Sequence, residues 1–374
     1  DQALEAYQDV AEVESRFLEE DKVVVEFGDL VIPVQDASIY KMGSTYLKMI
    51  EIENQAAEEA ETDEEKEQHR RLALEYAQKA TERFDRTQEQ TKIEELKAQA
   101  QNSVVNTWYE VLDYDRVIQE GHELIETYPE SNYVLDAMYN IGWAHYDKKE
   151  YDKSIETYTT LVNRFPTAGY KSDRALFQIG ESYYDQEQYS EAIPYYQRLV
   201  DKMRINELTD DEIRRIQRDK LAGITDETAL DLAAKSQLKV GACYANIGDF
   251  ESASAAYRRV AELFRFDQGL ISEAYQRMAD MYYERGDFES SIEAYRDAID
   301  EVPDRLFNAK MQVLICQRYF DEGRYEDAVR EYSHYISTYS DIALRANFDV
   351  DEAFLMLARS YYELGSEQIG NDQE

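Results

Sequence analysis

Cysteine and proline are scarce in this sequence of 374 residues, which holds 2 cysteines and 5 prolines. Cys243 and Cys316 fall where a small side chain is expected inside a helix, and a free cysteine there behaves as a small hydrophobe. We therefore expect neither a disulfide nor a redox role, and so few cysteines do not decide the compartment. Long apolar runs are missing as well. A membrane span needs roughly 18 or more such residues, so none is expected within these residues.

Positive charge is also in short supply. The 41 Lys and Arg residues face 79 Asp and Glu residues, which gives a formal net charge of −38. Such a surface repels nucleic acid and anionic membranes, so basic proteins or peptides remain as partners. A salt-loving source is one explanation, because molar salt shortens the Debye length to roughly 3 Å and screens self-repulsion. The alternative is that acidic faces simply keep a long molecule soluble.

Residue clusters that carry catalysis or bind metals are not evident. His69, His122, His145 and His334 lie in separate predicted helices without a second ligand at i+3 or i+4, and zinc needs such convergence. Carboxylates are so common that a close pair does not mark an acid–base dyad. No calcium loop, phosphate-binding glycine loop or nucleophile elbow occurs. We therefore expect a protein that has no cofactor and no metal and that is not an enzyme.

What the sequence does contain is a repeat. Residues 137–148 and 151–164 read as two short amphipathic helices, joined by a polar turn and closed by Pro166. First helices of successive repeats carry a small residue, which is Gly142, Gly180, Gly241, Ala279, Cys316 or Ala358. Second helices carry Ala or Ser and, four residues later, Tyr158, Tyr196, Tyr257, Tyr295 or Tyr332. Since small residues let helices approach closely while rings fill the space between successive pairs, most of these tyrosines are expected to be structural.

Spacing predicts the fold and its divisions. Successive small residues are 38, 61, 38, 37 and 42 residues apart. A period of this size is typical of an α-solenoid, and we predict an all-α superhelix of about seven helix pairs. The expected divisions are divergent helical repeats (1–97), regular repeats (98–202), an inserted helical segment (203–229), regular repeats with a terminal helix (230–365) and a polar tail (366–374).

Two parts of the chain depart from the regular pattern. Residues 1–19 are predicted to be the second helix of a repeat, followed by an extended connection at 20–34 and by helices at 35–60, 63–87 and 89–110. The long interval holds a capping box from Thr209 to Glu212 and a basic helix that ends at Gly223. Its Arg and Lys residues either pair with neighbouring acids or form a projection for a partner.

The repeated positions resemble those of the tetratricopeptide repeat, with small and aromatic residues in the first helix and alanine and an aromatic in the second. The departures are Ser154 and Ser291 in the alanine position and the longer spacing. The resemblance implies a right-handed superhelix that binds proteins without catalysis.

The longer spacing, together with the sequences at 128–131 and 161–166, is similar to that of one bacterial subgroup. This subgroup includes the periplasmic coordinator associated with the Tol-Pal system and the outer-membrane-protein assembly lipoprotein. The resemblance implies a scaffold in the bacterial cell envelope, periplasmic or outer-membrane-associated; a cytoplasmic location is the alternative.

In this superfamily the first helices line a concave groove, so the resemblance also implies a set of partner-binding residues. They are Tyr139, Trp143, Tyr146, Asp147, Phe177, Tyr184, Asp185, Tyr283, Glu284, Phe320 and Asp321. An aromatic floor with an acidic rim suits a peptide that bears basic and apolar residues. The rings could instead pack against the next repeat. Other open functions are a regulatory array within a longer protein and a glycan- or lipid-binding groove.

Overall fold

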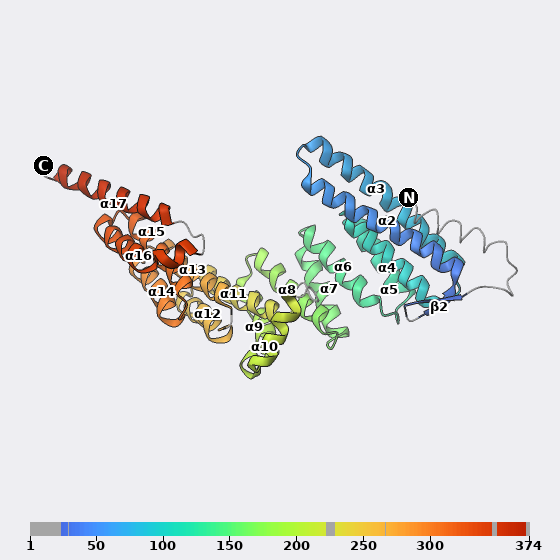
Figure 1. Ribbon diagram of the computed structural model, residues 1–374. Helices are drawn as coiled ribbons and strands as arrows, with labels where there is room; N and C mark the ends of the chain where they lie inside the picture. Colours follow the sequence, from blue (N-terminus) through green and yellow to red (C-terminus); the bar gives the residue numbers. More distant parts are fainter. Residues whose placement is uncertain (1–23, 29, 222–228, 266, 346–349, 372–374) are drawn as a thin grey trace. The chain divides into compact units, whose positions relative to one another are not determined.

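A computed structural model describes residues 24–28, 30–221, 229–265, 267–345 and 350–371 (Figure 1). The chain divides into two compact units, Asp1–Gln186 and Glu187–Glu374, here called unit 1 and unit 2. Each unit contains its own buried apolar cluster. The helix predicted at 1–19 lies outside the described residues.

Unit 1 is built from antiparallel helices that pack on their neighbours in chain order. They are α2 (Val34–Glu59), α3 (Asp63–Gln90), α4 (Glu94–Glu110), α5 (Tyr114–Thr127), α6 (Val134–Asp147), α7 (Tyr151–Arg164) and α8 (Tyr170–Asp185). The predicted capping box at the start of α3 is confirmed, because Thr62 accepts from the Glu65 backbone and Glu65 accepts from that of Thr62. The prediction for 89–110 is wrong at its start, since α3 continues to Gln90 and α4 begins only at Glu94.

A small hairpin precedes these helices. Strands β1 (Val24–Phe27) and β2 (Leu30–Pro33) pair antiparallel where the sequence predicted only an extended connection. Gly28, at φ +60°, adopts the left-handed backbone that lets the chain reverse at low cost. Ile32 is fully buried in the unit 1 core. The correction therefore has a physical reason: the extended segment buries an aliphatic side chain and closes its own hydrogen bonds.

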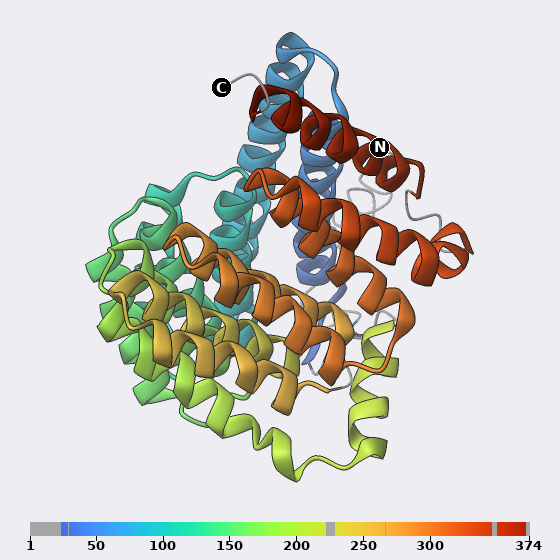
Figure 2. The same ribbon diagram turned by 90° about the vertical axis from the view of Figure 1, so that its left-hand side faces the viewer.

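Unit 2 continues the helical order. Its helices are α9 (Tyr189–Met203), α10 (Asp210–Leu221), α11 (Ala229–Ile247), α12 (Phe250–Leu263), α13 (Gln268–Glu284), α14 (Phe288–Glu301), α15 (Arg305–Asp321), α16 (Tyr325–Arg345) and α17 (Val350–Asn371). From α11 to α16 each helix packs on the next, and Figure 2 shows them as successive layers. Helix α9 packs on α11, which sets α10 apart as the extra helix between them.

The predicted polar tail at 366–374 is corrected, because α17 runs through Gly365 to Asn371. A glycine inside a helix costs only about 1 kcal/mol, and the Ser366 hydroxyl donates to the Tyr362 carbonyl oxygen. Without α10 and α17, fourteen α-helices are described, which is the number that seven pairs require. The all-α solenoid of about seven helix pairs is confirmed.

Contact between a glycine and a ring joins the two helices of three pairs. A Cβ atom placed on Gly142 would lie 2.6 Å from the Tyr158 ring, and one on Gly241 would lie 2.5 Å from that of Tyr257. Both tyrosines are buried. Each ring thus packs on the first helix of its own pair, whereas the repeat pattern had suggested a place between successive pairs. The same contact joins Gly43 of α2 to Phe84 of α3, at 2.7 Å, which makes α2 and α3 an enlarged copy of the regular pair.

Turns inside the pairs share one backbone motif. After α6, the Lys149 N–H donates to the Tyr146 carbonyl oxygen and the Glu150 N–H to that of His145, both at 2.8 Å. These bonds define a Schellman motif, which requires a left-handed residue at the position of Lys149. That residue is Leu112 (φ +59°) or Lys149 (φ +60°) in unit 1, and Glu187 (φ +61°), Gly248 (+88°), Gly286 (+80°) or Gly323 (+74°) in unit 2.

Candidate functional site

The predicted partner-binding residues all lie on first helices. Each lies in the C-terminal half of its helix, next to the loop that joins the pair, or within one helical turn before that half. The five rings predicted in unit 1 and unit 1's two acids occupy α6 and α8, and the remaining four residues occupy α13 and α15. All seven predicted aromatic side chains are partly buried, and all four predicted acidic residues are exposed. Partial burial fixes a ring while leaving part of it for a ligand, so the arrangement is compatible with an aromatic floor.

Helix α6 carries a connected set of rings. The Trp143 indole Nε1 donates to the Tyr139 hydroxyl oxygen at 2.8 Å, and the Trp143 ring meets that of Tyr146 edge to face with centroids 5.6 Å apart. The Tyr146 ring in turn meets Tyr151 of α7 at 5.6 Å. Each edge-to-face contact contributes about 0.5–1.5 kcal/mol beyond simple burial. The set is therefore held in place before any partner arrives.

Tyrosine hydroxyls engage the two acids of unit 1. The Tyr146 hydroxyl donates to Asp185 Oδ2 at 2.6 Å and so joins α6 to α8. Burial raises the pKa of Tyr146, and the hydrogen bond to Asp185 raises it further. Burial and a hydrogen bond to Asp147 likewise raise the pKa of Tyr114 in α5. Each carboxylate thus accepts a bond from the preceding repeat, and its other lone pairs remain for a ligand.

Arginines of the next repeat cover the predicted rings in unit 2. The Arg318 guanidinium lies 4.3 Å from the Tyr283 ring centroid, and that of Arg359 lies 5.8 Å from the Phe320 ring. Arg318 also forms an ion pair with Asp280. These contacts agree with the interpretation in which the predicted rings pack against the next repeat. In unit 1 the corresponding cation, Arg174, lies farther from Tyr139, at 6.0 Å.

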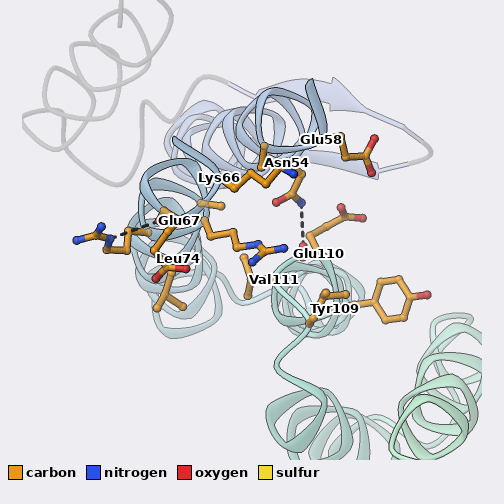
Figure 3. A pocket seen from close by; sticks show the side chains of 13 residues that line it. Asn54, Glu58, Lys66, Glu67, Leu74, Tyr109, Glu110 and Val111 are labelled. Atoms are coloured by element: carbon orange, nitrogen blue, oxygen red, sulfur yellow. Dashed lines mark hydrogen bonds between the residues drawn. The ribbon is translucent and has the colours of Figure 1, made fainter. Parts of the chain in front are cut away.

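A cavity that the sequence did not predict lies between α2, α3 and the end of α4 in unit 1 (Figure 3). Its volume is about 790 Å³. The lining comprises Asn54, Ala57, Glu58, Lys66, Glu67, Arg70, Arg71, Ala73, Leu74, Tyr109, Glu110, Val111 and Leu112. A hydrogen bond of 2.8 Å from Asn54 Nδ2 to the Glu110 carbonyl oxygen crosses it. The one sequence signal was Leu112, a large apolar residue in a turn position that holds Lys, Glu or Gly elsewhere.

The inserted helix α10 begins at the predicted capping box. The Thr209 hydroxyl accepts from the Glu212 N–H at 3.3 Å, and Glu212 accepts from the Thr209 N–H at 2.9 Å. Arg214 pairs with Asp211 at 3.5 Å, and Arg204 with Glu207 at 3.4 Å. These pairs agree with the interpretation that the basic residues are neutralised by neighbouring acids. The predicted helix end at Gly223 lies outside the described residues.

Two of the four histidines each pair with a single carboxylate. His69 Nδ1 lies 2.6 Å from Glu53, and His145 Nδ1 lies 2.8 Å from Glu150. In the described part of the chain, no three or more His, Cys, Asp or Glu side chains are grouped so that they could hold a metal ion. A search of the described helices also finds none with the length and apolar character needed to cross a membrane.

Comparison with known families identifies the repeats. Residues 139–204 and 244–305 match the family model of the tetratricopeptide repeat. These two stretches are therefore similar to tetratricopeptide repeats. The first begins at Tyr139 in α6, so the ring set of α6 lies inside the match. Tetratricopeptide repeats build protein-interaction scaffolds, and a scaffold of this kind is the class of protein that the helical array supports.

Solved structures to which this chain is similar include tetratricopeptide repeat proteins. YrrB, described as having an unusual peptide-binding site, is 18% identical over 56% of this chain and 89% of its own, with a TM-score of 0.36. A tetratricopeptide repeat protein from Parabacteroides merdae is 12% identical over 85% and 99%, at 0.39. The apo form of RapI is 10% identical over 98% of both chains, at 0.43. These TM-scores are too low to support any functional argument. No match to this sequence was found among curated proteins.

Proposed function

We propose that unit 1 binds a segment of a partner protein that carries basic and apolar side chains, on the surface formed by α6 and α8. The surface comprises Tyr139, Trp143, Tyr146, Asp147, Phe177, Tyr184 and Asp185. The observation that carries the proposal is the hydrogen-bonded ring set of α6, which is tied to Asp185 of α8 through Tyr146. The set is partly exposed.

Each component of this surface has a role in the proposed complex. A lysine or arginine of the partner would lie over a ring face, which contributes roughly 0.5–2 kcal/mol depending on how well water is excluded. Asp147 and Asp185 are exposed and would pair with the same cations. Because the rings are already fixed by their mutual contacts, little side-chain entropy is lost on binding.

The proposal places the ligand on unit 1 because the rings of unit 2 already carry cations. Arg318 occupies the place over Tyr283 that a ligand cation would need. The four predicted residues of unit 2, namely Tyr283, Glu284, Phe320 and Asp321, are therefore proposed as a weaker part of the groove.

A matched pair of double variants tests this function. Basic, apolar peptides on an array are screened against the protein, and affinities of the best binders are measured by fluorescence anisotropy. Trp143→Ala with Tyr184→Ala should weaken binding at least about tenfold, as expected when ring anchors are truncated. Tyr283→Ala with Phe320→Ala should change it by less than about threefold. Equal affinity of both variants and the unaltered protein would sink the proposal.

A cell-envelope location is part of the proposal and is supported by the resemblance at 128–131 and 161–166 alone. Fractionation of source cells with an antibody against this chain tests it. Recovery with periplasmic or outer-membrane markers is expected, and recovery with cytoplasmic markers would contradict it.

A salt-loving source is likewise proposed from the net charge of −38. Self-repulsion between acidic faces falls as the Debye length shrinks from about 10 Å at 0.1 M to about 3 Å at 1 M salt. The melting temperature should rise steeply over this range, and a flat response in calorimetry would overturn the idea.

A further inference from the structure

The cavity of unit 1 exists because two helices are longer than the layer that covers them. Helices α2 and α3 have 26 and 28 residues, whereas α4 has 17. Figure 1 shows the paired ends of α2 and α3 extending beyond α4. Beyond the end of α4, the sides of α2 and α3 that pack on it are therefore left uncovered. Leu74 of α3 is accordingly 43% exposed.

Two cations of α3 line the cavity without a partner. Within the described part of the chain, neither Lys66 nor Arg70 makes a side-chain hydrogen bond or an ion pair. A third, Arg71, donates only through Nε to the Glu67 carbonyl oxygen at 3.3 Å. Unpaired cations facing one hollow are unexpected where acids outnumber bases 79 to 41. They favour an anionic ligand.

Leu112 is the second independent observation. It adopts φ +59° in the turn after α4 and is 65% exposed. The Schellman motif requires the left-handed backbone at this position, but it does not require a leucine, because the equivalent turns hold Lys149, Glu187 or glycine. Exposing a leucine forfeits its burial, so the turn does not explain this side chain. It forms part of the cavity wall with Val111, where it offers an apolar contact to a ligand.

We propose that this cavity binds an acidic, aliphatic segment of a partner protein. Carboxylates of the segment would pair with Lys66 and Arg70, and an aliphatic side chain would pack on Leu74, Val111 and Leu112. A volume of about 790 Å³ lies within the ≈ 300–1,000 Å³ of ordinary ligand pockets, enough for a few side chains. The charge preference is opposite to that of the α6 and α8 surface, so the two sites would bind different segments.

Three carboxylates also line the cavity and limit what it accepts. Glu58 and Glu67 are exposed, and in Figure 3 the Glu58 side chain points away from Lys66. Glu110 is partly buried, and burial together with nearby Glu51 raises its pKa. A single acidic group beside an aliphatic one therefore fits better than a dense run of acids. At physiological salt the Debye length is about 8 Å, so more distant acids of the chain are largely screened.

Selection from a phage-displayed library of linear 12-residue peptides against the full chain tests the proposal. Enriched peptides are expected to combine Asp or Glu with Leu, Ile or Val. The best peptide is then synthesised and titrated by fluorescence anisotropy. The variant Lys66→Ala, Arg70→Ala, Arg71→Ala should bind it at least about tenfold more weakly, since it removes the charge-assisted hydrogen bonds to the carboxylates of the peptide.

The matched control is Lys48→Ala, Arg86→Ala, Lys92→Ala, which removes the same charge from exposed positions of unit 1 outside the cavity. It should bind within about twofold of the unaltered chain. Equal weakening in both triple variants would show a general charge effect and overturn the site. Enrichment of basic peptides only would also overturn the site. So would self-association of the unaltered chain, measured by analytical ultracentrifugation, if the variant Lys66→Ala, Arg70→Ala, Arg71→Ala abolishes it.

Leu112→Gly separates binding from folding. Glycine suits the left-handed position, so the melting temperature should stay the same or rise, while affinity for the selected peptide falls. A variant that keeps full affinity would show that Leu112 takes no part in the site. Because the α6 and α8 surface uses other residues, the double variant Trp143→Ala, Tyr184→Ala should bind the acidic peptide normally.

Discussion

Unit 1 and unit 2 are built from the same kind of helix pair, but the turns and the contacts of the rings differ. Inside the pairs of unit 1 the left-handed turn residue is Leu112 or Lys149, whereas the three pairs from α11 to α16 in unit 2 have glycine there and only Glu187, before α9, is not a glycine. Rings on the first helices of unit 1 are joined to each other and to Asp185. In unit 2, arginines of the next repeat lie over Phe250, Tyr283, Phe288 and Phe320. Unit 2 thus pairs these rings with arginines of the next repeat, while unit 1 joins the rings of α6 to one another and to an exposed carboxylate.

This difference indicates that stacking and binding use separate positions of one repeat. Contact between Gly142 and Tyr158 and that between Gly241 and Tyr257 are nearly identical, at 2.6 and 2.5 Å. The positions that differ lie at the turn and on the outer ring surface. A repeat array can therefore change its ligand without changing its core.

The largest expected effect concerns the buried tyrosines of the second helices, which both units share. Tyr158→Ala in unit 1 and Tyr295→Ala in unit 2 remove fully buried rings, and each should cost about 3–5 kcal/mol of unfolding free energy. Urea denaturation followed by circular dichroism measures both. A loss below about 1 kcal/mol in one unit only would show that the pairs are not packed alike.

A smaller effect should follow from removing the arginines over the rings. Arg318→Gln with Arg359→Gln frees the faces of Tyr283 and Phe320 at a cost of about 1–2 kcal/mol in stability. A basic peptide that the unaltered chain binds through unit 1 should then bind at a second place. Isothermal titration calorimetry reports this as raised stoichiometry. Arg296→Gln, which removes an exposed arginine paired with Glu331, is the control and should leave it unchanged.

Exchanging the turn residues should have opposite signs in the two units. Lys149→Gly places glycine at φ +60° and should stabilise unit 1 by roughly 0.5–1 kcal/mol, whereas Gly286→Lys, at φ +80°, should destabilise unit 2 by roughly 1 kcal/mol. Differential scanning calorimetry measures both shifts. Changes of the same sign would mean that the left-handed backbone does not control these turns.

The smallest expected effect is a pH dependence confined to unit 1. His145 occupies a position that holds Tyr244, Tyr282 or Tyr319 in unit 2, and burial lowers its pKa although its hydrogen bond to Glu150 opposes the shift. The folded state therefore takes up its proton less readily than the unfolded chain. Stability should be full above about pH 6.5 and fall as the pH is lowered toward the folded pKa.

His145→Tyr should remove this dependence, and His334→Tyr, at an exposed position, should not. Melting curves between pH 7.5 and 5.5 make the comparison, because the Glu150 carboxyl, whose pKa is lowered to about 2 by Lys153 and His145, stays charged throughout. An unchanged slope in His145→Tyr would assign the effect elsewhere.

Much of the fold could be predicted because periodicity and caps are local. Small residues recurring every 37 or 38 positions, and the Thr62 and Thr209 capping boxes, each follow from contacts within a few turns of helix. The hairpin at Val24–Pro33 could not be predicted in this way, since it depends on burying Ile32 in a core formed by distant residues. Nor could the end of α17, where propensity alone favoured a stop at Gly365.

The candidate site was only partly predictable. Sequence pattern placed Trp143, Tyr146 and Asp185 on first helices, but it did not show that Tyr146 donates to Asp185 or that Arg318 covers Tyr283, because these contacts join residues about one repeat apart. Lys66, Arg70 and Leu112 share no motif at all. Their cavity arises from the unequal lengths of three helices.

The sequence by itself determined the helix pair, its number of copies and the glycine or alanine that lets each pair close, since these depend on spacing along one chain. Only the tertiary structure decided which rings are covered by the chain's own arginines and which are left partly open, and where cations face a cavity. The physical reason is that periodicity specifies which face of a helix is buried, whereas the neighbour that meets each side chain depends on how successive helices are stacked.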